Sequence, residues 1–178
     1  MANLDQAWVG IDVPAFMRAR LGRQSSVIND ADAAALGEAA FGAAKDVAGT
    51  VIVTTLGTGI GSGIVVDGVL VPNVELGHLE IDGADAESRA SARQKHIESL
   101  SWADWAVRLQ RYYSHVEKVF SPDLFVVGGA VSADAAFFLP LLDLRTRIVP
   151  AVLENRAGVI GAAYAAGRGA DMNASRMV

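Results

Sequence analysis

The sequence has no cysteine, which excludes disulfide bridges and thiolate metal sites and makes the cytoplasm the expected compartment. It also lacks a basic excess, because its 15 Lys and Arg residues stand against 20 Asp and Glu residues and the formal net charge is −5. Proteins that bind nucleic acid usually carry such an excess. We therefore expect no nucleic-acid partner.

Long apolar runs are missing too. None approaches the roughly 20 residues that cross a bilayer, and the first residues lack the basic and then apolar order of a secretory signal. We therefore expect no membrane partner. Apolar residues are nevertheless abundant, at 52% of 178 residues, and apolar segments alternate with charged ones. This composition is typical of an ordered globular protein.

Strand-like and helix-like segments alternate along the chain, which predicts an α/β fold. Asp30 stands where the N-cap of a helix is expected, and Asp32 should be exposed on that helix. We expect residues 72–98 to be irregular and 169–178 to be a frayed tail. Strands are expected at 26–29, 50–56, 64–66, 69–71, 124–127 and 146–149, and helices at 14–21, 31–44, 101–119, 132–139 and 157–167.

A glycine-rich run at 57–63 follows a buried strand and leads into a second strand. Glycines in such a place let backbone N–H groups approach phosphate oxygens closely. A Walker loop is excluded because the run has no lysine, and a dinucleotide-binding fingerprint because Ser62 or Ile64 stands where its third glycine is required. The order of strand, glycine turn and strand favours a phosphate-binding hairpin, with a plain glycine turn as the alternative.

Carboxylates gather at two further places. Asp30 follows a predicted strand, and its carboxylate suits a general base that takes a proton from an attacking hydroxyl, with a helix cap as the alternative. The segment Glu75–Glu80 combines two carboxylates and an imidazole, which suits hydrogen bonding to several hydroxyl groups. A polar loop is the alternative there. Zinc is disfavoured because the sequence has three histidines and no thiolate.

Three basic residues, Arg89, Arg93 and His96, are spaced so that one helical face would carry them all. Such a face would guide a polyanion. Glu87 and Glu98 offset its charge, so an ordinary solvated face is the favoured alternative.

Four motifs, taken in order, resemble the ROK family of sugar kinases and repressors. Residues 75–82 and 85–91, together with Ser101-Trp102, are similar to the polyphosphate glucokinase branch of that family. The resemblance covers residues 3–168. The four motifs are Asn29-Asp30-Ala31-Asp32-Ala33-Ala34, Gly57-Thr58-Gly59-Ile60-Gly61, Glu75-Leu76-Gly77-His78 and Pro122-Asp123-Leu124-Phe125-Val126-Val127-Gly128-Gly129-Ala130-Val131-Ser132.

This resemblance implies the actin-like ATPase (ribonuclease H-like) fold. It also implies transfer of a phosphoryl group from polyphosphate, ATP or both to the 6-hydroxyl of glucose, with Mg²⁺ at the donor and a homodimer as the assembly. Asp30 would be the catalytic base. By the same resemblance glucose would contact Asn29, Glu75, His78, Glu80 and Asn3, and the donor would contact Thr55, Gly57, Thr58, Gly59, Gly61, Gly128 and Gly129.

Two departures from the family pattern stand out. ATP-dependent relatives carry a zinc-binding cysteine cluster, and because this chain has no cysteine we expect no zinc at His78. The family's opening Asp-x-Gly-Gly phosphate motif is not found before Asn29. The resemblance therefore implies an N-terminally truncated kinase, with a remnant of the small domain at 1–30, the large domain at 31–168 and a frayed tail after it. A non-catalytic sugar-binding module related to ROK repressors and an inert kinase fragment are the alternatives.

Overall fold

A five-stranded sheet forms the centre of the computed structural model, which describes residues 6–174. The strand order is β3-β2-β1-β6-β7. β2 runs antiparallel to β1 and β3, whereas β1, β6 and β7 are parallel. The bounds are β1 Thr50–Leu56, β2 Ile60–Val66, β3 Val69–Val71, β6 Leu124–Gly128 and β7 Arg147–Pro150. The predicted α/β class is confirmed, as are all the expected strands except 26–29.

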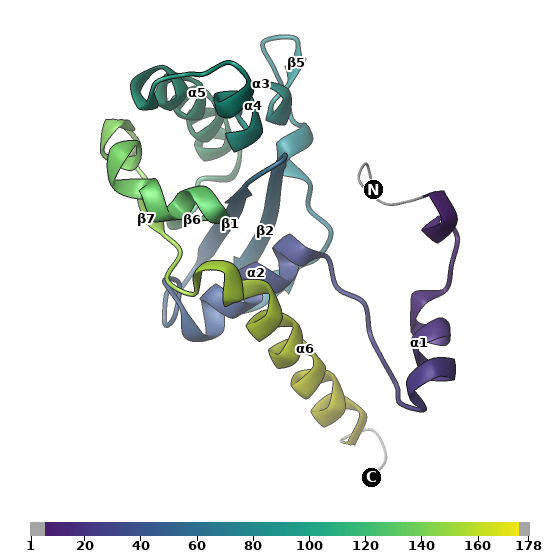
Figure 1. Cartoon of the computed structure of the whole chain (residues 1–178). Helices are drawn as coiled ribbons and strands as arrows, with labels where there is room; N and C mark the ends of the chain where they lie inside the picture. The colour runs from purple at the N-terminus through teal and green to yellow at the C-terminus, as the bar shows by residue number, and fades with distance from the viewer. Residues whose placement is uncertain (1–5, 175–178) are drawn as a thin grey trace.

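Helices cover both faces of the sheet (Figure 1). One face carries α5, Trp102–Phe120, and the other carries α2, Asp30–Phe41, with α6, Ala157–Ala174, packed on α2. Side chains of a strand alternate between the two faces. Accordingly Ile52 of β1 joins the core cluster on the α5 side, and its neighbour Val53 joins the cluster on the α2 side.

Small residues let α2 and α6 approach closely. A Cβ at Gly161 would collide with the carbonyl of Ala33, and one at Gly37 would collide with the carbonyl of Ala157. The expected helix at 157–167 is confirmed. It extends to Ala174, into the region where a frayed tail was predicted, and residues 175–178 lie outside the described part of the chain.

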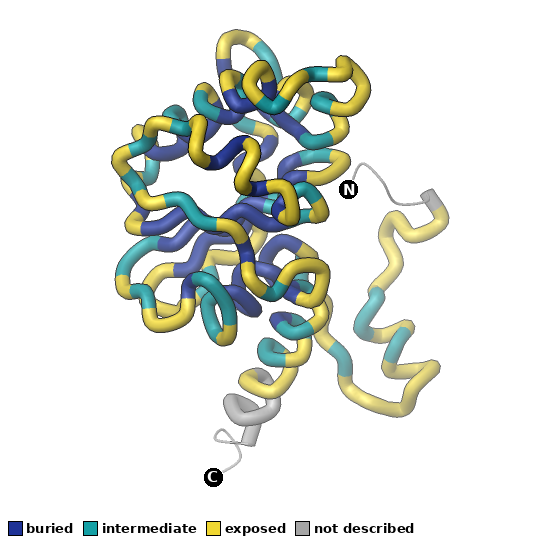
Figure 2. Tube along the Cα trace, turned by 60° about the vertical axis from the view of Figure 1, so that its left-hand side comes forward, coloured by how far each residue is buried: buried dark blue, intermediate teal, exposed yellow. Residues whose placement is uncertain are grey.

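The N-terminal segment, residues 6–29, stands beside this body and is largely exposed (Figures 1 and 2). It contains η1, Gln6–Trp8, and the expected helix, α1, Val13–Leu21, which has no buried residue. The predicted strand at 26–29 is wrong, because these residues pair with no strand in the described part of the chain. Their β-branched composition suits a strand, but a strand also requires a hydrogen-bonded neighbour.

The N-terminus of α2 differs from the prediction in two ways. Asn29, and not Asp30, is the N-cap: its Oδ1 accepts hydrogen bonds from the N–H groups of Ala31 and Asp32 at 2.8 and 3.2 Å. Asn and Asp are both favourable N-cap residues, so the sequence Asn29-Asp30 does not show which of the two caps the helix. Asp32 is 1% exposed, because it faces inward and its Oδ2 accepts from the Asn73 N–H at 2.9 Å.

Residues 72–98 form a series of short elements where an irregular region was expected. These are η2 Leu76–His78, β4 Glu80–Ile81, β5 Ala84–Asp85, α3 Glu87–Ala90 and α4 Ala92–Ile97. The helical path breaks at Ser91, which ends α3 and caps α4. Arg89 and Arg93 therefore do not share a helical face, and that prediction is wrong.

The remaining elements follow β6. The helix predicted at 132–139 is replaced by 3-10 turns, η3 Ala130–Phe137 and η4 Leu139–Leu141, and η5 Glu154–Arg156 precedes α6. The long helix α5 begins as expected, with the Ser101 side chain accepting from the Asp104 N–H. Within residues 6–174, no helix combines the length and apolarity that crossing a membrane requires.

Candidate active site

A cavity of about 580 Å³ opens where β1 ends, at the N-terminus of α2. Segments far apart in the sequence meet here: the start of α2, the turn from β1 to β2, the region around η2, and the short helices α3 and α4. Most of the predicted site residues line it, namely Asn29, Asp30, Thr55, Gly57, Thr58, Gly59, Gly61, Glu75, His78 and Gly129. Ile60, Glu87 and Arg93 line it as well.

Three predicted site residues lie elsewhere. Gly128 lines an adjoining cavity of about 260 Å³, which shares Asp30, Thr55 and Gly129 with the first. Glu80 is exposed in β4 and does not line either cavity. Asn3 lies outside the described residues.

Asp30 offers an available carboxylate to the cavity. Its Oδ1 accepts from the Ala31 N–H at 2.9 Å, while its Oδ2 has no hydrogen-bond partner among the described residues. The adjacent Asn29 caps α2 with its amide oxygen and donates from Nδ2 to Glu75 Oε1 at 3.4 Å. The helix start thus brings a free carboxylate oxygen next to the polar side chains of the η2 region.

The glycine loop, defined here as residues 57–61, is held against the short helices. The Ile60 N–H donates to Glu87 Oε2 at 3.0 Å, and the Arg93 N–H donates to the Gly57 carbonyl at 3.0 Å. By contrast, the N–H groups of Thr58 and Gly59 donate to no acceptor among the described residues. Two free N–H groups at a cavity are the arrangement that binds phosphate oxygens.

Glycine is required at two positions around the loop. A Cβ at Gly61 would collide with Thr55 Oγ1 and lie 3.1 Å from the Ala31 Cβ. Gly129 has a φ of +85°, and a Cβ there would meet the backbone of Leu56. These contacts let α2 and the end of β6 approach β1, and so they close one wall of the cavity.

His78 forms a hydrogen bond from Nδ1 to Asp85 Oδ2 at 2.8 Å. This bond raises the pKa of His78 above its ordinary 6.5; desolvation opposes the shift, and the charge of Glu87 adds to it. Ligand atoms of His78, Asp85 and Glu87 all lie within 4.8 Å of one another, so the three side chains could together hold a metal ion. Elemental analysis of the chelator-washed protein tests the prediction that no zinc is bound here.

The sequence pattern of the ROK family matches residues 1–95. The chain belongs to the ROK family. It is 44% identical over 165 residues to the polyphosphate glucokinase of Mycobacterium tuberculosis (strain CDC 1551 / Oshkosh), and this match covers 92% of the chain and 62% of that relative. The chain thus spans less than two thirds of the length of that relative.

Solved structures agree on the fold. The inorganic polyphosphate/ATP-glucomannokinase of Arthrobacter sp. strain KM is similar with a TM-score of 0.87 and 60% identity, over 92% of this chain and 65% of that one. A ROK family glucokinase from Streptomyces griseus, solved in complex with glucose and AMPPNP, has a TM-score of 0.72 and 24% identity, over 84% and 70% of the two chains. The predicted actin-like ATPase fold is confirmed by these likenesses.

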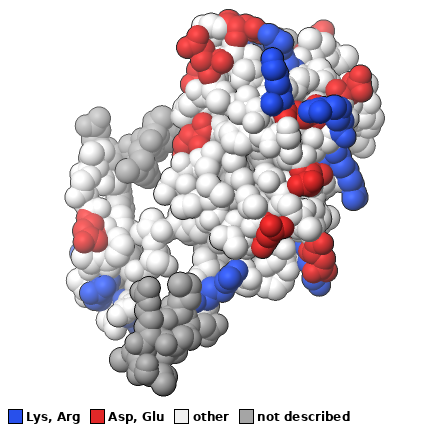
Figure 3. All heavy atoms as spheres, turned by 180° about the vertical axis from the view of Figure 1, so that it is seen from behind, with Lys and Arg blue, Asp and Glu red and all other residues white. Residues whose placement is uncertain are grey.

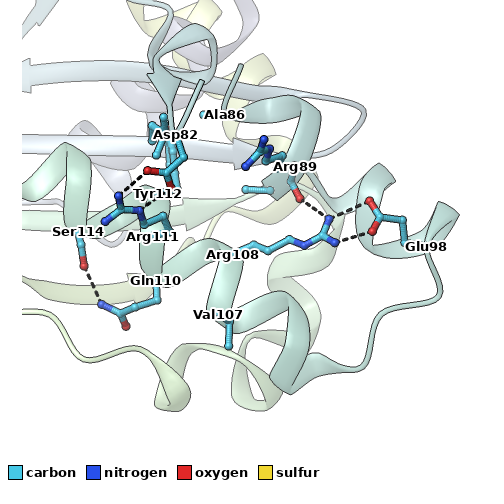
Figure 4. Close-up of a pocket in the computed structure, with 12 residues that line it drawn as sticks. Asp82, Ala86, Arg89, Glu98, Val107, Arg108, Gln110, Arg111, Tyr112 and Ser114 are labelled. Carbon is cyan, nitrogen blue, oxygen red and sulfur yellow. Dashed lines mark hydrogen bonds and ion pairs between the residues drawn. The ribbon is translucent and has the colours of Figure 1, made fainter. Parts of the chain in front are cut away.

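A second cavity of this ROK protein, about 690 Å³, lies between α5 and the β4–β5 hairpin (Figure 4). None of the residues predicted to contact glucose or the donor lines it, but Arg89, one of the three basic residues considered for a polyanion, does. Arg111 donates from Nε to Asp82 Oδ2 at 2.8 Å, and Arg108 donates from Nη1 to Glu98 Oε1 at 2.8 Å. Basic and acidic side chains are also interspersed on the upper part of the face in Figure 3. Arg108 and Arg111 are thus already paired with carboxylates, and we assign no ligand to this cavity.

Three lining residues of the 580 Å³ cavity were not in the predicted set, namely Ile60, Glu87 and Arg93. The sequence pattern placed Arg93 on one helical face with Arg89. In the structure, Arg89 lines the 690 Å³ cavity instead. The break at Ser91 turns the two arginines toward different cavities. Ser91-Ala92-Arg93-Gln94 has the serine and glutamine of a helix start, but nothing local indicated that another helix ends at Ser91.

Proposed function

We propose that the protein acts as a glucokinase, transferring a phosphoryl group from polyphosphate or ATP to the 6-hydroxyl of glucose. The observation that carries the proposal is that Asp30, with an unpaired Oδ2, lines one cavity with the glycine loop and with Glu75 and His78. The relatives named polyphosphate glucokinase and polyphosphate/ATP-glucomannokinase support the choice of substrates. Because the chain spans 62% of the former, its activity stays a proposal.

In this proposal Asp30 is the general base. Its Oδ2 accepts the proton of the 6-hydroxyl while the hydroxyl oxygen forms a bond to the terminal phosphorus of the donor. The bond from that phosphorus to the bridging oxygen breaks, and the shortened donor leaves. The free N–H groups of Thr58 and Gly59 bind the donor phosphates.

The acceptor is oriented by the polar side chains opposite the glycine loop. Glu75 accepts hydrogen bonds from the sugar hydroxyls, and His78 contacts them through Nε2, since its Nδ1 is bonded to Asp85. Asn29 links this group to α2 through its contact with Glu75. Binding on two sides holds the hydroxyl and the phosphorus close together, and such positioning supplies much of the rate in phosphoryl transfer.

Mg²⁺ fits the side chains of the same cavity. Glu87 would provide a carboxylate oxygen, because its Oε1 has no hydrogen-bond partner among the described residues, whereas Asp30 Oδ2 is needed to accept the proton of the 6-hydroxyl. Mg²⁺ prefers such oxygen ligands and is usually held by one or two carboxylates together with substrate phosphates. When bound, it neutralises charge that develops on the transferred group.

We also propose a homodimer and a cytoplasmic location. The resemblance to ROK kinases supports the homodimer. The cysteine-free composition is compatible with the location.

A coupled assay for glucose 6-phosphate tests the proposed function. The 178-residue chain is compared with the same chain extended by the N-terminal part of the M. tuberculosis relative, each with polyphosphate and with ATP. We expect slow turnover from the shorter form and faster turnover from the extended form, since a second domain completes the alignment of the donor. Glucose binding without turnover in both forms would instead indicate a non-catalytic sugar-binding module, and no binding in either would indicate an inert fragment.

A further inference from the structure

Glu75 lines the cavity, but hydrogen bonds of its own side chain hold it in place only weakly. The side chain is exposed, and its carboxylate has a single hydrogen bond among the described residues, from Asn29 Nδ2 at 3.4 Å. That distance is longer than a typical N–H···O bond. The position of Glu75 therefore depends on what holds its backbone.

Ser62 holds that backbone on both sides of Glu75. Its hydroxyl donates to the Val74 carbonyl at 2.8 Å and accepts from the Leu76 N–H at 2.8 Å. These two groups belong to the peptide bonds before and after Glu75, so one hydroxyl fixes both peptide planes. Ser62 is 2% exposed and Leu76 is 4% exposed, so water does not replace these bonds.

Ser62 is itself part of the rigid sheet. It is paired with Thr54 of β1 and directly follows Gly61, the last residue of the glycine loop. Asp32 adds a second anchor, because its Oδ2 accepts from the Asn73 N–H at 2.9 Å. The strand that continues from the glycine loop thus also supports residues 73–78 on the other side of the cavity.

We propose that Ser62 is a positioning residue for the sugar site, and that its hydroxyl sets the sugar affinity by fixing residues 73–78, which carry Glu75 and His78. This inference rests on the proposed function, since it assumes that a sugar binds between these residues and Asp30. Ser62 does not line the cavity and acts only through the backbone of Glu75.

The test uses Ser62→Ala in the 178-residue chain, with Thr54→Val as the matched control. Thr54 is the buried neighbour of Ser62 across the β1–β2 ladder, but its hydroxyl bonds to the Tyr113 hydroxyl at 2.7 Å and does not reach residues 73–78. Two quantities are measured for each variant. They are the hydrogen–deuterium exchange of residues 73–78 and the dissociation constant for glucose by calorimetry.

We expect Ser62→Ala to speed exchange across 73–78 and to weaken glucose binding about tenfold. Ser62→Ala and Thr54→Val should lower Tm by similar amounts, but Thr54→Val should leave the exchange of residues 73–78 and the glucose affinity unchanged. Ser62→Thr, which keeps the hydroxyl, should restore the exchange rate and the glucose affinity of the unchanged chain. Unchanged exchange in Ser62→Ala, or an equal loss of glucose affinity in Ser62→Ala and Thr54→Val, would overturn the proposal. If Ser62→Ala does not fold, Ser62→Cys replaces it, with the same expectations, because a thiol is a weaker hydrogen-bonding group.

The outcome also separates this inference from the proposed function. An unchanged chain that binds no glucose would contradict the proposed function. Faster exchange of residues 73–78 in Ser62→Ala would then still support the positioning role of Ser62, and unchanged exchange would overturn it.

Discussion

The glycine loop and residues 73–78 face the same cavity, but they are held in place by different means. The loop connects two neighbouring strands, so the β1–β2 ladder fixes both of its ends. Residues 73–78 belong to no large element, and the side chains of Ser62 and Asp32 fix them instead. One wall of the site therefore depends on backbone geometry, and the other depends on a few buried polar groups.

The largest effect is expected where the two walls meet, at Asp30. In the extended chain, Asp30→Asn should lower kcat about 10²- to 10⁴-fold, equivalent to about 3–5 kcal/mol of barrier, because the proton of the attacking hydroxyl loses its acceptor. Glucose affinity should stay the same. Asp134→Asn, at an exposed residue outside the cavities, is the control. A fall of less than about tenfold in the Asp30 variant would leave Asp30 with only a helix-end role.

Substitutions in the glycine loop test its dependence on backbone geometry. Gly61→Ala should destabilise the fold by about 1–3 kcal/mol, because the new methyl collides with Thr55 Oγ1 and crowds Ala31. Gly57→Ala is the matched variant, since a Cβ there meets nothing within 4 Å, and its Tm should be unchanged. Thermal unfolding of both proteins checks this. Equal losses of stability would show that the loop is not confined as described.

Arg93 and Arg89 form a matched pair for testing whether a basic side chain helps to bind polyphosphate. Only Arg93 lines the proposed active site, while Arg89 lines the cavity beside α5. In the extended chain, Arg93→Glu should raise KM for polyphosphate about fivefold, the effect of roughly 1 kcal/mol for an exposed charge, and raise KM for ATP less. Arg89→Glu should change neither. Equal effects of Arg93→Glu on both donors would remove its role with the longer polyanion.

The smallest effect concerns His78. Its hydrogen bond to Asp85 raises its pKa above 6.5, so Asp85→Asn should bring the pKa back toward 6.5 in an NMR titration. Because the pKa is raised in the folded state, the pair stabilises the protein fully below pH 6.5, and this stabilisation is lost as the pH rises through the folded pKa. An unshifted histidine in the unchanged protein would contradict the contact.

Local patterns in the sequence predicted the two strands on either side of the glycine loop correctly. The β-branched run of β1 and the glycines each act within a few residues of the chain. The hairpin between β2 and β3 is equally local, because Asp67 and Gly68 both have the positive φ that such a turn requires. The small residues of α6 explain its close packing on α2, although the sequence did not indicate which helix it would contact.

The opposite wall could not be predicted in the same way. Asp32 was expected to be exposed, because its partner Asn73 lies 41 positions further along the chain and no local pattern connects them. The role of Ser62 was hidden for the same reason. At residues 26–29 the local composition was misleading. It favoured a strand, but no neighbouring strand pairs with these residues in the described part of the chain.

A crystal structure of the chain with glucose and an unreactive ATP analogue would test the central claim most directly. The account predicts glucose in the 580 Å³ cavity, with its 6-hydroxyl oxygen at roughly 3 Å from Asp30 Oδ2 and the donor phosphates on the N–H groups of Thr58 and Gly59. Glucose bound in the cavity beside α5, or with its 6-hydroxyl turned away from Asp30, would contradict it.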